Sequence, residues 1–212
     1  IDLLWQGKGS RPARYGFDFS RNVTSNFEVH GEWARIQDVT RRAVDSAGRI
    51  TASTGNATSY LLGLRYLTEG NTTYIAEYYR NGTGYSADES RDFYRFVDTA
   101  FARLDATGDA SLVQRALSLS QGSYGRPNPG SQYLYARAQQ KDAFGIVYFQ
   151  PGVTAMMNVG DRSFQVTPEL LYTGINNVEL RARLYLLHGG RDTDFGAKQN
   201  SRKIEFQARL YF

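Results

Sequence analysis

Charged side chains occupy every second position in several segments of the chain. In residues 178–187, Glu179, Arg181 and Arg183 are each separated by one apolar residue. Because successive side chains of a β-strand point to opposite faces, these three would share one face of a strand. Guanidinium groups present a planar fork of N–H donors that suits carboxylates and phosphates. The spacing therefore predicts a charged surface that could bind anionic groups.

The same alternation places a larger set of charged residues on one face by parity. Its basic members are Arg14, Arg65, Arg137, Arg181, Arg183, Lys203 and Arg209, and its acidic members are Glu28, Glu32, Glu77, Glu169, Glu179 and Glu205. Arg181 and Arg183 would face Glu169 across a short turn, and with Arg209 they form the strongest basic group. Two interpretations stay open: ion pairs that only fill a narrow interior, or a path whose arginines favour anionic solutes.

The positions between the charged residues are apolar up to the last residue of the chain. The final segment, 204–212, reads IEFQARLYF, with an apolar residue at each odd-numbered place of the segment. About ten segments show this period of two, and a helical period occurs in one region only. The chain has no Cys, which excludes disulfides and thiolate metal sites within it. The pattern predicts an all-β fold.

Short and long connections alternate along the chain. Short turns are expected near 21–26, 68–71, 140–145 and 174–177, and the other connections near 8–12, 37–57, 81–130, 159–162 and 189–201. Short turns at one rim and longer loops at the other are typical of antiparallel up-and-down barrels of bacterial outer membranes. We therefore predict that residues 1–212 form a single transmembrane β-barrel domain of about ten strands, either complete or the C-terminal part of a larger barrel.

A membrane barrel explains this polarity better than a soluble β-sandwich or a lipocalin-like barrel, whose apolar side chains would point inward. A strand tilted by about 45° crosses the hydrocarbon layer with roughly 9–11 residues, and several segments are close to that length. Lipid supplies no hydrogen bonds, so the strands must close into a ring. An arginine that faced the bilayer at mid-depth would cost about 2–4 kcal/mol, so the charged side must face the lumen.

The last strand resembles the C-terminal strand of bacterial outer-membrane β-barrel proteins, which alternates apolar residues and ends on an aromatic one. Phe206, Leu210 and Phe212 occupy these positions. The segments TTYIAEYYRNGTGYS and LLYTGINNVELRARLYLLHGG resemble porin segments in their general residue pattern. The resemblance implies that the barrel-assembly machinery reads this strand. It also implies an outer-membrane location in a Gram-negative bacterium, contact with lipid and lipopolysaccharide, and a periplasmic C-terminus.

Residues 81–130 carry the one helical period. Ser86 lies three residues before Glu89, which is the spacing of a capping box. Apolar residues then recur at helical intervals; Gly108 could end this helix and Asp109 could cap a second one. We expect a helical hairpin on the extracellular rim. It could pack against itself or the barrel wall, fold inward as a plug, cover the mouth or contact a partner.

The histidines offer little support for catalysis. His30 lies between Glu28 and Glu32 at alternate positions, and these three residues spread over about 13 Å, too far for one ion without help from other strands. The other histidine, His188, lies beside a loop. No nucleophile-elbow, zinc-protease or P-loop motif occurs, and no basic stripe with exposed aromatics indicates nucleic-acid binding. We expect no enzyme activity, no catalytic residue, no metal and no cofactor.

The function that these patterns predict is a porin-like outer-membrane channel. It would let small polar, anionic solutes diffuse, passively or with facilitation, through an Arg-lined lumen. An alternative is a barrel that serves as a sleeve or scaffold for a partner protein in secretion or electron transfer. A third alternative is an outer-membrane hydrolase that depends on His30.

Overall fold

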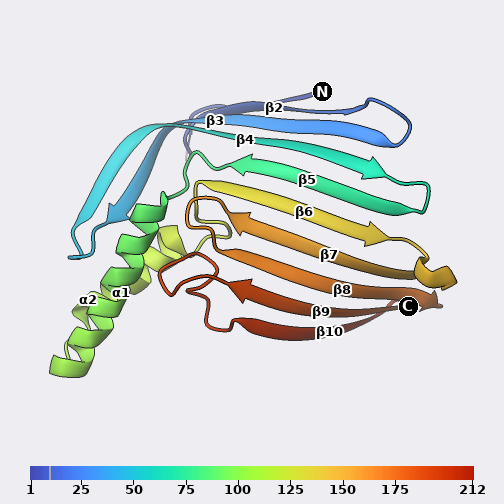
Figure 1. Cartoon of the computed structure of the whole chain (residues 1–212). Coiled ribbons are helices and arrows are strands. Elements are labelled where there is room, and N and C mark those ends of the chain that lie inside the picture. Colours follow the sequence, from blue (N-terminus) through green and yellow to red (C-terminus); the bar gives the residue numbers. More distant parts are fainter. Residues whose placement is uncertain (10) are drawn as a thin grey trace.

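The computed structural model describes residues 1–9 and 11–212 (Figure 1). It contains one antiparallel sheet in which each strand pairs with its neighbours in sequence. The strands are β1 (Asp2–Gln6), β2 (Arg14–Asn22), β3 (Phe27–Val44), β4 (Ile50–Leu67), β5 (Thr72–Arg80), β6 (Gln132–Gln140), β7 (Phe149–Asn158), β8 (Phe164–Ile175), β9 (Val178–His188) and β10 (Arg202–Leu210). The helices are α1 (Ala87–Thr107) and α2 (Ser111–Leu119), followed by a π-helical turn, Ser120–Tyr124, and later a 3-10 turn, Ala143–Gly145.

The prediction of an all-β, antiparallel, up-and-down fold is confirmed, with ten strands in the sheet. The sheet is open: across the described part of the chain, β1 pairs with β2 alone and β10 with β9 alone. Each of these edge strands therefore leaves one row of backbone N–H and C=O groups without a strand partner.

The register divides the side chains of the sheet into two faces. All the charged positions predicted by parity fall on one of them, which we call the charged face. The opposite face, which we call the apolar face, carries aliphatic and aromatic side chains, and many of them are exposed. Leu170 is 51% exposed, Leu134 is 47% exposed and Phe206 is 81% exposed. Such a surface is unusual for a protein surrounded by water alone.

Residues 37–57 were expected to be a polar connection, and this is wrong. They continue β3 and β4 far beyond the other strands and join them through a turn at Asp45–Arg49, whose Asp45 carboxylate accepts hydrogen bonds from the backbone N–H groups of Ala47 and Arg49. A register shift between Ile36 and Val39 marks where this β3–β4 extension begins. Figure 1 shows the extension bending away from the sheet and reaching the helices.

The main buried core lies at this junction and not within the sheet. It consists of Val44, Tyr85, Phe93, Phe96, Ala116, Leu119 and Tyr124. The Tyr124 ring is stacked between Tyr85 and Phe93, with centroid separations of 3.9 and 4.0 Å. The core therefore holds the helical hairpin and the β3–β4 extension together. Among the described residues, no helix is both long enough and apolar enough to span a membrane.

The predicted start and end of α1 are confirmed. Ser86 and Glu89 form a reciprocal capping box, and Gly108 adopts the left-handed conformation that ends the helix. The predicted cap of α2 is wrong by one residue. Ala110 is the N-cap, while the Asp109 carboxylate accepts a hydrogen bond from the Ser111 backbone N–H. A short Asx turn thus replaces the expected cap.

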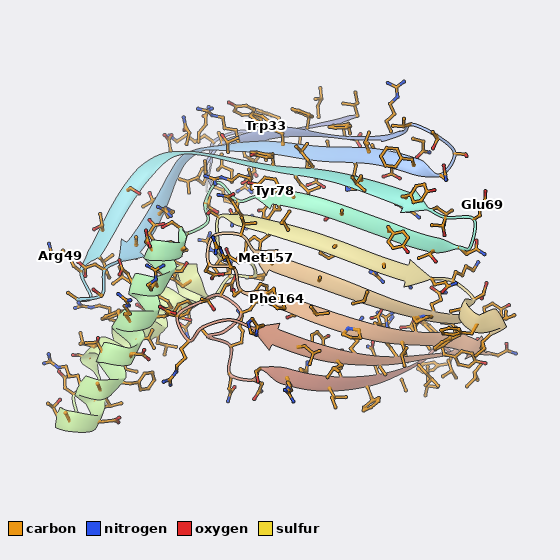
Figure 2. The ribbon with its side chains drawn as sticks, in the orientation of Figure 1. Trp33, Arg49, Glu69, Tyr78, Met157 and Phe164 are labelled. Atoms are coloured by element: carbon orange, nitrogen blue, oxygen red, sulfur yellow. The ribbon has the colours of Figure 1, made fainter. Side chains whose placement is uncertain are left out.

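The two ends of the sheet differ in their connections. One end has the turns after β2, β4, β6 and β8, together with the end of β10. The other end has the β3–β4 extension, the helical hairpin and the loop before β10. Figure 2 shows Glu69 at the first end and Arg49 at the tip of the extension. We call these ends the short-turn rim and the long-loop rim.

Candidate functional site

Glu169 of β8 is the centre of an ion-pair network on the charged face. Its carboxylate accepts a hydrogen bond from Arg183 Nε, and Arg181 Nη1 lies 3.4 Å from the same oxygen, Oε2. From β6, Arg137 Nη2 lies 3.6 Å from Oε1. The side chain of Glu169 is only 13% exposed. Several guanidinium groups from two strands therefore share one nearly buried carboxylate.

The network continues across β9 and β10. Glu205 bridges Arg183 Nη1 at 3.1 Å and Lys203 Nζ at 2.8 Å. Glu179 pairs with Arg181 Nη2 at 3.0 Å. Arg209 is at the margin of the group, with Nη1 4.0 Å from Glu179. Sequence pairing across the turn correctly predicts that Arg181 and Arg183 face Glu169, and the structure adds Arg137 from the other side.

This half of the charged face carries more basic than acidic side chains. From β6 to β10, the basic ones are Arg137, Arg181, Arg183, Lys203 and Arg209, and the acidic ones are Glu169, Glu179 and Glu205. Ion pairing therefore neutralises part of the basic charge and leaves an excess of guanidinium and ammonium groups.

The half from β1 to β5 has the opposite balance. Its acidic residues are Asp2, Asp18, Glu28, Glu32 and Glu77, and its basic residues are Arg14 and Arg65. Asp2 and Asp18 lie at positions that parity would assign to this face, although they were not among the predicted charged residues. Asp18 faces Glu32 directly in the register.

His30 lies between two carboxylates, but not the two that its sequence neighbours suggest. Its Nδ1 is 3.5 Å from Glu28, and its Nε2 is 3.4 Å from Glu77 on β5. The contact with Glu77 spans the intervening strand β4, where Gly63 faces both residues and has no side chain to separate them. Within the described residues, no group of three or more His, Asp or Glu side chains is arranged to hold a metal ion.

The residues predicted as the assembly signal lie at the end of the chain. Phe206 and Leu210 are on the apolar face of β10, where they are strongly exposed. Phe212 follows the strand and is also exposed. The last strand thus presents a continuous apolar surface beside its free edge.

At the long-loop rim, an ion pair joins the β3–β4 extension to α1. Arg41 donates from Nη1 to Glu89 Oε2 at 2.9 Å and from Nη2 to the other carboxylate oxygen, and it also bonds the Gly84 carbonyl. Burial of the carboxyl group would by itself raise the pKa of Glu89. Hydrogen bonds from Arg41 and from the Ser86 backbone outweigh that effect, so the net pKa is lowered. This pair is the main polar contact between the two elements.

A second polar cluster joins the other loops of the same rim. The hydroxyl of Tyr133 donates to Asp194 Oδ2 at 2.6 Å, and the amide of Asn158 lies 3.4 Å from the same oxygen. The backbone N–H of Asp194 bonds Asp161, whose carboxylate also accepts from Ser163. Tyr133, Asp194 and Ser163 are nearly inaccessible. Sequence periodicity gives no signal for such a loop cluster.

Comparison of the chain with protein-family models, with curated proteins and with solved structures found no match.

Proposed function

We propose that this chain forms the wall of a bacterial outer-membrane channel that passes small polar, anionic solutes. The apolar face would contact acyl chains, and the charged face would line the lumen. The observation that carries the proposal is the separation of the two faces of the ten-stranded sheet. The predicted charged residues share one face, and the opposite face is mainly apolar, with many of its apolar side chains exposed.

Hollows on the apolar face support its contact with lipid. One groove is bounded by Leu62, Leu64, Leu134, Met157 and Phe164, and a second by residues of β8, β9 and β10. Figure 2 shows Met157 and Phe164 on neighbouring strands at this surface. Irregular apolar grooves of this kind can be filled by acyl chains, whereas exposing them to water is unfavourable.

We also propose that the sheet closes into a barrel in the membrane. A bilayer cannot satisfy the open edges of β1 and β10, so both would be paired in the membrane. The short-turn rim would face the periplasm, where the barrel-assembly machinery would read β10. The long-loop rim, with its helical hairpin, would face lipopolysaccharide and the exterior.

We attribute anion preference to the wall from β6 to β10, where basic side chains outnumber acidic ones and solutes would pass, while the wall from β1 to β5 has the opposite balance. Arginine and lysine rings in a pore raise the local concentration of anions. The test is the reversal potential of the folded protein in planar bilayers under a KCl gradient. We expect selectivity for chloride over potassium.

Neighbouring residues on β10 offer a matched pair of variants. Lys203 is on the charged face and Arg202 is on the apolar face. Lys203→Gln should shift the reversal potential toward cations, whereas Arg202→Gln, which removes the same charge, should leave it nearly unchanged. Equal shifts in both variants, or folded protein that never conducts, would contradict the proposed channel.

A further inference from the structure

A hollow of about 510 Å³ lies on the charged face over β1 to β5. On each strand, the first and the last residue that line the hollow have their side chains on the charged face. The hollow therefore opens on that face. Its floor is formed by Gly16 and Ala34, which are paired in the register. Because both residues are small, the surface is recessed between larger side chains on either side.

The two ends of this hollow carry opposite charge. Toward the long-loop rim, Arg14 is paired with Ile36, and toward the short-turn rim, Asp18 is paired with Glu32. Arg14 and Asp18 are separated by four positions of one strand, or roughly 13 Å between Cα atoms. Leu61 lines the side of the hollow and offers an apolar contact between the charged ends.

These charged groups are not neutralised by their surroundings. Across residues 1–9 and 11–212, no ion pair involves Arg14, Asp18 or Glu32. The Nε of Arg14 is buried and has no hydrogen-bond partner. Like charges directly opposite one another, as at Asp18 and Glu32, destabilise a sheet. A bound cation beside Asp18 and Glu32 and a bound anion beside Arg14 would neutralise the two ends of the hollow.

We propose that this hollow binds a zwitterion with an ammonium group at one end and a carboxylate at the other, of the length of a short peptide. An extended tripeptide spans roughly 10 Å, which fits within the roughly 13 Å between the Cα atoms of Arg14 and Asp18. A neutral sugar would leave both ends uncompensated, and a simple anion would leave the carboxylates uncompensated. This inference rests on the proposed function, because the charged face must be open to solvent.

The test is calorimetric binding of trialanine to the folded, detergent-solubilised protein. Two analogues each remove one charge: N-acetyl-trialanine lacks the ammonium group, and trialanine amide lacks the carboxylate. We expect trialanine to bind and each analogue to bind about tenfold more weakly, as loss of one charged contact predicts. Equal affinity for all three peptides, or no binding of trialanine, would overturn the inference.

Variants test which end of the hollow binds the carboxylate of the peptide and which end binds its ammonium group. Arg14→Gln should abolish the preference for the free carboxylate, whereas Arg21→Gln, on the same strand but on the apolar face, should retain it. Glu32→Gln should abolish the preference for the free ammonium group. Ala34→Phe fills the floor without changing any charge and should weaken binding about tenfold or more. Unchanged affinity in Ala34→Phe would place the peptide elsewhere and overturn the inference.

Conductance separates this inference from the proposed function. A protein that conducts chloride but does not bind trialanine keeps the channel and overturns the zwitterion site. A protein that binds trialanine with the expected dependence on both charges, but never conducts, supports the site and contradicts the channel.

Discussion

Among single residues, Glu169 determines how much of the basic charge on the charged face is neutralised. Arg137, Arg181 and Arg183 converge on its carboxylate, which is nearly excluded from solvent. A carboxylate in this position lowers the repulsion between the guanidinium groups, and it also cancels part of their attraction for anions. In the proposed channel, Glu169 would therefore raise the stability and lower the selectivity for anions.

Glu169→Gln should make the proposed channel more selective for anions and the protein less stable. Loss of charge-assisted hydrogen bonds predicts destabilisation of about 1–3 kcal/mol. Reversal potentials and urea unfolding in the same detergent measure the two effects. Glu69→Gln, at an exposed turn of the short-turn rim (Figure 2), is the control. Lower anion selectivity in Glu169→Gln would contradict the role given to this residue.

At the scale of elements, the helical hairpin and the β3–β4 extension form one unit. Stacked aromatic rings supply its core, and the Arg41–Glu89 pair supplies its main polar contact. The unit lies outside the part of the sheet where short strands pair, so it can loosen without loss of the sheet. Its local stability should therefore differ from the global stability.

Acid should loosen this unit before it unfolds the sheet. The pKa of Glu89 is lower in the folded state than its ordinary value of 4.5. Its contribution is therefore fully present above that value and is lost as the pH falls through the lowered folded pKa. Once the intrinsic pH dependence of amide exchange is subtracted, the protection of the amides in residues 37–57 should fall in the wild type as the pH drops below 4.5.

Glu89→Gln is the matched variant for the acid effect. It should exchange faster in residues 37–57 at neutral pH, by an amount that corresponds to about 1–3 kcal/mol, and it should lose most of the acid dependence. The control is Asp88→Asn, which likewise replaces a carboxylate by an amide of the same shape. Asp88 is an exposed neighbour that pairs with Arg91 and does not contact Arg41. Identical acid profiles for Glu89→Gln and the wild type would exclude Glu89 as the titrating group.

The sequence predicts most of this architecture because segments such as residues 203–210 of β10 alternate polar and apolar residues without interruption. The β3–β4 extension escapes such prediction for a physical reason. It has polar residues on both faces. Thr40 and Thr54 are paired on one face, where their hydroxyls lie 3.0 Å apart, and Arg41 and Ser53 are paired on the other. Its apolar residues Ala43 and Val44 pack against the helices. The periodicity of one segment does not predict such a contact with another segment.

The partners of charged residues are predictable only where strand order is simple. The contact of Arg183 with Glu169 follows from one hairpin. The contact of His30 with Glu77 crosses a whole strand, and it depends on the absence of a side chain at Gly63. The hollow above Gly16 and Ala34 likewise depends on the exact register between β2 and β3. Parity alone assigns a face but not a neighbour.

At the scale of the whole molecule, the open edges make a prediction of their own. In a bilayer, the β10 amides that do not bond β9 should exchange as slowly as those of the central strand β6, because unpaired groups are not tolerated there. Hydrogen exchange in proteoliposomes, read by mass spectrometry, measures this. Fast exchange along β10 beside slow exchange in β6 would mean that the edge stays open in lipid, against the proposed closure.

Spin labels can determine which of the two faces contacts lipid and which contacts water. The chain has no Cys, so single-Cys variants can be labelled without background. Leu180→Cys and Phe206→Cys sample the apolar face, and their neighbours Arg181→Cys and Gln207→Cys sample the charged face. In bilayers, we predict that the first pair collides with lipid-soluble oxygen and the second with a water-soluble nickel chelate. The reverse result, with Arg181 and Gln207 in contact with lipid, would rule out a lumen lined by the charged face.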